Sequence, residues 1–101
     1  MPAYLIVRAQ VDPSVHDAFD TWYESEHLPD AHAAFRPISA KRGWSELESD
    51  VHVAIYEFKD LTAVKAVMAS QKIKDLIAEF DRHWEGKVTR TREVLPLKQM
   101  I

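Results

Sequence analysis

Hydrophobic and polar positions near the start of the chain predict a strand followed by a helix. Residues 3–11 (AYLIVRAQV) are rich in aliphatic and β-branched side chains and stop at an Asp-Pro pair. Asp12 can cap the helix, and Pro13 can occupy its first turn, where no N–H is needed. Apolar side chains then recur at helical spacing as far as Trp22, so this helix buries one stripe.

A proline limits the length of this first helix. Pro29 disfavours helical geometry at Leu28, so we expect the helix to end around His27, with residues 30–35 as a short second turn. The same stretch, FDTWYESEHLPDAH at residues 19–32, also holds aromatic, acidic and histidine side chains. Folding does not require a histidine at this point, so this stretch is the first candidate for functional chemistry.

The second half of the chain repeats both kinds of pattern. It predicts two strands, two helices and a final strand at residues 38–48, 51–58, 61–70, 73–84 and 88–97. Ser49 and Asp50 suit a tight hairpin connection, and Gly86 suits the stop of the last helix. The order βαββαβ predicts an α+β, ferredoxin-like fold over one domain, residues 1–101, with an antiparallel sheet and both helices on one face.

The other face of that sheet is expected to lie bare. By strand alternation it would carry residues such as Tyr4, Ile6, Arg8, Trp44, His52, Tyr56 and Phe58, although the sequence leaves open which parity faces the helices. A large apolar face in water calls for a partner, so we expect a homodimer formed through the sheets.

Composition narrows the classes of partner. Hydrophobic residues make up 47% and charged residues 29%, as in ordinary globular proteins, and the net charge of −3 gives no attraction for nucleic acid. No stretch approaches the ~20 apolar residues that span a bilayer, and the N-terminal apolar run is too short and interrupted for a signal peptide. The chain has no cysteine, which favours a cytoplasmic location.

A motif in the first helix resembles a known family. The pattern F-x-x-W-Y-x-x-E-H-x-P is formed by Phe19, Trp22, Tyr23, Glu26, His27 and Pro29. With the PISAKRGW stretch and the hairpin that follow, it resembles the EthD-like branch of the dimeric α+β barrel superfamily. The resemblance implies protomers whose sheets face each other around a small-molecule cavity, and chemistry that includes cofactor-free monooxygenases, isomerases and cyclases. It implicates Trp22, Tyr23, Glu26, His27, Pro29, Lys41 and Arg42, although the usual Pro-Gly-aromatic start of the second strand is absent.

His27 and Tyr23 are the candidate catalytic residues. Imidazole titrates near neutral pH and can act as a general acid or base. Tyr23 lies four residues earlier, on the same helix face, so both side chains could reach one substrate oxygen, as enolisation or cyclisation requires. The alternatives are that His27 caps a helix end in its positive form, and that Tyr23 and Trp22 are apolar anchors.

Trp22, Arg42, Trp44 and Tyr56 are the expected substrate-binding residues. Among the strand arginines, Arg42 is preferred for an anionic oxygen because the resemblance also selects it, whereas Arg90 and Arg92 are interpreted as a solvated or dimer-pairing edge. A metal site could be imagined from Glu26, His27, His32 and His52. Their spacing matches no ligand motif, and we expect neither a metal nor another cofactor.

Two main functions follow from these residues. The first is a cofactor-independent enzyme of monooxygenase, isomerase or cyclase type. It would act on a small oxygenated compound in a cavity of about 300 Å³ or more, with His27 as general acid or base. The alternative is a non-catalytic small-molecule-binding or accessory protein of a degradative or biosynthetic pathway. A third possibility is a dimer whose only visible role is its own sheet packing.

Overall fold

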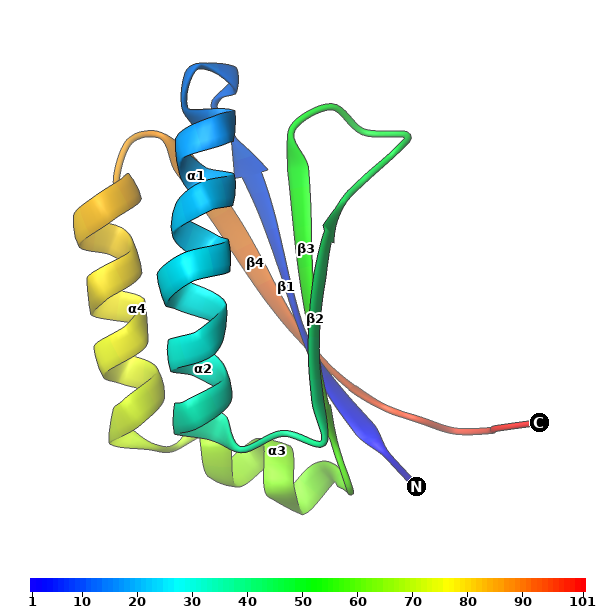
Figure 1. Cartoon of the computed structure of the whole chain (residues 1–101). Coiled ribbons are helices and arrows are strands. Elements are labelled where there is room, and N and C mark those ends of the chain that lie inside the picture. The colour runs from blue at the N-terminus through cyan, green and yellow to red at the C-terminus, as the bar shows by residue number, and fades with distance from the viewer.

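The computed structural model covers residues 1–101 and shows a four-stranded sheet with all helices on one face (Figure 1). The strands are β1 (Ala3–Val11), β2 (Ser39–Trp44), β3 (Val51–Phe58) and β4 (Val88–Pro96). They pair antiparallel in the order β2-β3-β1-β4. The helical segments are the 3₁₀ turn η1 (Pro13–Val15), α1 (His16–Trp22), the π-helical turn η2 (Tyr23–His27), α2 (Leu28–Phe35), α3 (Leu61–Met68) and α4 (Gln71–Trp84). The expected ferredoxin-like α+β fold is confirmed.

The connection from β1 into the first helix follows the sequence signals. The Asp12 side chain accepts a hydrogen bond from the Ser14 backbone N–H at 2.9 Å, and Pro13 opens the 3₁₀ turn. The hairpin between β2 and β3 is longer than expected, because residues 45–50 form its loop. Asp50 closes that loop with a positive φ of 58°, which asparagine and aspartate adopt more readily than most residues.

The first helix does not end at His27, and that prediction is wrong. The chain widens into a π-helical turn, in which the Leu28 N–H donates to the Tyr23 carbonyl five residues back. In a regular α-helix the ring of Pro29 would clash with the carbonyl of Ser25. The wider turn accommodates the proline, so the helix continues as α2.

The real end of this helix lies at Phe35. Arg36 adopts the left-handed conformation, with φ 51°, and its N–H donates to the His32 carbonyl at 3.0 Å. Pro37 follows and cannot continue the helix. The chain then enters β2, so one helical rod about twenty residues long, from His16 to Phe35, lies along the sheet beside α4 (Figure 1).

The pairing of β1 with β3 decides which residues face the helices. Leu5 is opposite Tyr56 and Ala9 is opposite His52, and all four are buried beneath the helices. Directly paired residues share one sheet face. The bare face was expected to carry seven residues, and four of them lie on the helix-covered face instead: Trp44, His52, Tyr56 and Phe58. Tyr4, Ile6 and Arg8 lie on the opposite, bare face.

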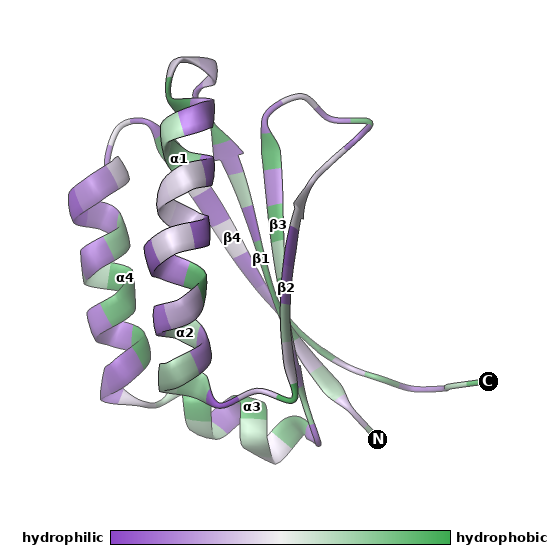
Figure 2. Ribbon diagram, viewed as in Figure 1, coloured by the Kyte–Doolittle hydropathy of each residue, from purple (hydrophilic) through white to green (hydrophobic).

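The helix-covered face holds the core, and the other face of the sheet carries no helix. Figure 2 shows the hydrophobic side of α4 turned toward the rest of the molecule and its hydrophilic side turned outward. On the bare face, Ile55 and Leu95 remain 37% and 40% exposed, beside charged residues such as Lys41 and Glu93. None of the helices has the length and apolar character needed to cross a membrane.

Candidate functional site

A small cavity lies between the sheet and the helices of a single chain. Its apolar wall consists of Leu5, Val7, Phe35, Ile73, Leu76, Ile77 and Phe80, and its polar groups belong to Tyr23, His27, Tyr56, Arg90 and Arg92. The resemblance implied instead a cavity enclosed by two facing sheets.

The cavity is also smaller than the sequence led us to expect. Its volume is about 30 Å³, which holds one or two water molecules at most. A larger ligand therefore enters only when lining side chains, four of which lie on α4, move aside.

His27 reaches this cavity from the π-helical turn. Its ring stacks on Trp22 with centroids 4.8 Å apart, meets Tyr23 edge-on at 4.8 Å, and lies 5.5 Å from Phe80. Burial and, to a smaller extent, the nearby charge of Arg90 together lower the pKa of His27 to about 4. The ring is therefore neutral at neutral pH and can accept a proton. The alternative of a positively charged helix cap is wrong, because the helix continues and the pKa falls.

Two tyrosines bring phenol groups to the cavity. The hydroxyl oxygens of Tyr23 and Tyr56 lie 3.4 Å apart, close enough for one to donate weakly to the other. Burial raises the pKa of both, so both keep their protons at neutral pH. The structure thus brings Tyr23 and His27 together as expected, and adds Tyr56 as a neighbour of Tyr23.

Arg90 and Arg92 extend from β4 to the same cavity. The interpretation as a solvated or dimer-pairing edge is wrong for Arg90, whose side chain is 10% exposed, whereas Arg92 is exposed on the edge strand, as that interpretation expected. The Arg90 guanidinium lies 3.7 Å from the Phe80 ring centroid and donates to the Asp81 carboxylate at 3.2 Å. Burial lowers the pKa of Arg90 to about 10, which leaves it charged at neutral pH. Arg92 has no hydrogen-bond or ion-pair partner in the chain.

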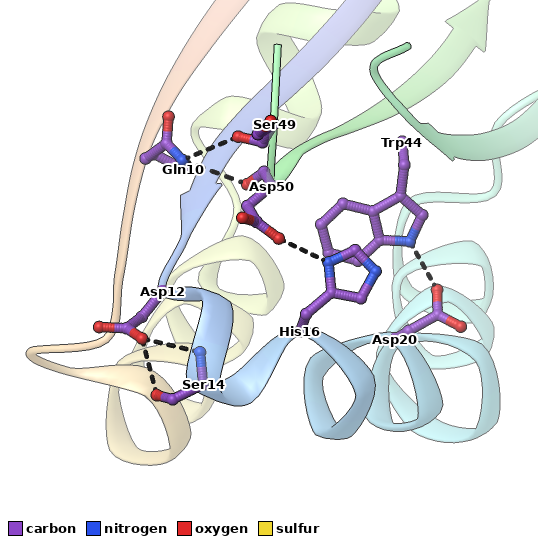
Figure 3. Close-up of polar contacts among 8 residues, drawn as sticks. All are labelled: Gln10, Asp12, Ser14, His16, Asp20, Trp44, Ser49 and Asp50. Atoms are coloured by element: carbon purple, nitrogen blue, oxygen red, sulfur yellow. Dashed lines mark hydrogen bonds and ion pairs between the residues drawn. The ribbon is translucent and has the colours of Figure 1, made fainter.

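Arg42 and Trp44 do not line the cavity. Arg42 donates to the Asp20 carboxylate at 2.7 Å, and one of its nitrogens lies 3.3 Å from Nε2 of His52. The Trp44 indole N–H donates to the same Asp20 oxygen at 2.8 Å (Figure 3). The hydrogen bond from Arg42 lowers the pKa of Asp20. These contacts hold β2 against α1, so Arg42 and Trp44 have a structural role.

The hairpin loop is fixed to the start of α1 by a second set of contacts. His16 stacks on Trp44 with centroids 3.8 Å apart, and its Nδ1 lies 2.9 Å from the Asp50 carboxylate (Figure 3). The side-chain amide of Gln10, on β1, donates to the carbonyls of Ser49 and Asp50 in the same loop. This cluster is continuous with the Asp20 contacts and lies outside the cavity.

The remaining motif residues divide between core and surface. Trp22 is 8% exposed and packs among aromatic rings outside the cavity, and its indole N–H has no partner. Glu26 and His32 are exposed. No group of three or more histidine, aspartate or glutamate side chains lies close enough to hold a metal ion.

Comparisons of the sequence with protein families and with curated proteins identify no relative. No protein-family model matches the sequence. No curated protein matches it either.

Among solved structures, an EthD family protein from Bacillus halodurans aligns with a TM-score of 0.71 at 18% identity, covering 99% of this chain and 100% of that one. HapK from Hahella chejuensis aligns with a TM-score of 0.70 at 18% identity, covering 97% and 92%. A mutant of SnoaB, a cofactor-independent oxygenase from Streptomyces nogalater, aligns with a TM-score of 0.69 at 13% identity, covering 99% and 96%. These neighbours are dimeric α+β barrel proteins, and the likeness shows that this chain has their ferredoxin-like fold.

Proposed function

We propose that this protein binds a small, oxygenated organic compound in the cavity and is a cofactor-independent enzyme of monooxygenase, isomerase or cyclase type. The main support is a neutral imidazole, His27, which lines a mostly apolar cavity together with the Tyr23 phenol. SnoaB, which shares this fold, is a cofactor-independent oxygenase, and its activity is consistent with such chemistry.

Proton removal is the step that this geometry suits. A ring nitrogen of His27 would take a proton from a carbon next to a carbonyl, and the electron pair of that C–H bond would move onto the carbonyl oxygen. Tyr23 would donate a hydrogen bond to the resulting enolate, and the positive charges of Arg90 and Arg92 would stabilise it. Such interactions are stronger in a mostly apolar cavity than in water. An enolate can then react with oxygen, regain a proton elsewhere or close a ring.

Hydrogen exchange at carbon tests this proposal without knowledge of the substrate. The neutral ketone 2-tetralone, dissolved in deuterated water, exchanges the hydrogens beside its carbonyl, and NMR follows the loss of their signal. The protein should accelerate this exchange, and His27→Gln should reduce the acceleration by about 10²–10⁴. Circular dichroism should show that the variant keeps its fold.

The same samples distinguish the non-catalytic alternative. A binding protein would show saturable shifts of the Tyr23 and His27 NMR signals on addition of 2-tetralone, with exchange no faster than in buffer. That result would contradict an enzyme whose base is His27.

We also propose that two chains pair through their bare sheet faces. Ile55 and Leu95 are large apolar side chains left exposed there, and the neighbouring structures belong to proteins that form dimers. Burial of this face against a second copy would remove its apolar area from water.

A further inference from the structure

The charges that line the cavity are unbalanced. Two guanidinium groups line it, and none of the twelve lining residues carries a carboxylate. The one acid near them, Asp81, is 61% exposed and bonds to Arg90 from the rim. Since His27 is neutral and Asp81 pairs with Arg90, the positive charge of Arg92 has no counterion in the chain.

The arrangement of the two arginines suits an anion more than solvent. The Arg90 side chain is only 10% exposed, lies over the Phe80 ring and bonds to Asp81, so its donors are positioned before any ligand arrives. Arg92 lies two residues along the same strand on the same face, about 6.6 Å away along the backbone. Two guanidinium groups at this spacing can both donate to one small anion placed between them. Arg92 is exposed and has no ion-pair partner in the chain, so an incoming anion would supply one.

The rest of the lining indicates what the anion is attached to. Seven of the twelve lining residues are wholly apolar, and the rings of Tyr23 and Tyr56 add further apolar surface, so most of the ligand must be apolar. The chain's two glycines, Gly43 and Gly86, lie outside the cavity, so no glycine-rich loop offers the backbone N–H groups that phosphates commonly use. A planar carboxylate matches the guanidinium fork with two parallel hydrogen bonds.

We propose, resting on the function above, that the ligand is a monocarboxylate with an apolar body, its carboxylate bound by Arg90 and Arg92 and its body packed against Phe80 and Ile77. Such a ligand would place its negative charge beside His27 and opposite the two cations. This assigns a substrate class to the site and a recognition role to two arginines that the sequence motif does not include.

Carboxylate binding has a consequence for the base. The charged and titratable groups that face His27 are Arg90 and Arg92 from β4, His52 from β3 and His83 from α4, with Tyr23 on its own helix. Both arginines lower the pKa of His27. A bound carboxylate offsets their charge, so the pKa of His27 rises toward its ordinary value and the imidazole becomes a stronger base when the substrate is present.

A matched pair of probes tests the proposal. Benzoate and benzamide have nearly the same shape, and only benzoate is charged. Titrated into the ¹⁵N-labelled protein, benzoate should shift the NMR signals of Tyr23, His27 and Phe80 with an affinity at least about tenfold above that of benzamide. Arg92→Gln should reduce benzoate affinity to the level of benzamide. Arg82→Gln removes the same charge from the exposed outer side of α4 and should leave both affinities unchanged.

Each other outcome has a defined meaning. Equal affinity for benzoate and benzamide, absence of benzoate binding, or equal effects of Arg92→Gln and Arg82→Gln would overturn the carboxylate proposal. Binding of ionised 4-nitrophenol without binding of benzoate would overturn it in favour of a phenolate ligand. Exchange of 2-tetralone that persists alongside any of these results would leave the proposed function standing. Loss of that exchange, with neither probe bound at the cavity, would remove both proposals.

Discussion

Acid should destabilise this fold because two histidines, the buried His52 and the partly buried His27, are held as neutral rings. Burial lowers the pKa of both His27 and His52 to about 4, from an ordinary value of 6.5. Between these two values the unfolded chain binds protons that the folded chain does not. Stability is therefore fully present above about pH 6.5, falls as the pH drops through this window, and levels off below the folded pKa near 4.

The size of this loss of stability follows from how far the pKa of each histidine is lowered. A lowering of about 2.5 units corresponds to about 3 kcal/mol for each histidine, since one unit is about 1.4 kcal/mol. Small domains have only about 5–15 kcal/mol of stability in total. Loss of the neutral form of His27 would thus remove a large share of the stability of the fold.

Comparison with a variant isolates His27 from the carboxylates that also titrate in acid. His27→Gln keeps a polar side chain but cannot bind a proton in this range. Urea unfolding, measured at steps from about pH 7 to pH 4, should show that the wild type loses about 3 kcal/mol more than the variant. His32→Gln, at an exposed position on α2, should follow the wild type and serves as the control. Parallel stability curves for the wild type and His27→Gln would refute a buried neutral His27.

Two further predictions concern the core and the bare sheet face. Trp22→Ala should lower the free energy of unfolding by about 3–5 kcal/mol, and Trp22→Phe should cost clearly less because the indole N–H has no partner to lose, as thermal or urea unfolding would show. Light scattering at micromolar concentration should give twice the 11.6 kDa chain mass, and Ile55→Lys should shift the protein toward monomer; a wild-type mass of 11.6 kDa would contradict the proposed dimer.

The order of elements could be predicted because each one has a local signal. Asp12 and Pro13 mark the start of the first helix, and the structure confirms both roles. The amphipathic pattern of residues 73–84 likewise gives α4, which begins two residues earlier at Gln71. Signals of this kind depend on neighbours within one or two turns, so the sequence alone contains them.

The assignment of strand faces depends on long-range pairing. β1 has apolar residues at both parities near its start, so alternation alone cannot distinguish Tyr4 from Leu5 as the core residue. Once β4 pairs with β1, Arg92 lies opposite Val7 and Arg90 opposite Ala9. Both arginines then share the helix-covered face, which is why they line the cavity and Arg42, held by Asp20, does not.

The response of the helix to Pro29 explains why functional chemistry is concentrated around His27. A local rule treats the proline as a stop, and a helix that ended there would leave His27 near solvent, where the dipole favours its charged form. The π-helical turn instead lets the helix continue to Phe35, whose ring packs edge-on against Tyr56 at 5.5 Å and closes one side of the cavity. The widened turn and the continued helix together hold His27 between Trp22 and Phe80, where it is partly buried. The His27 imidazole is therefore neutral because the helix continues past Pro29.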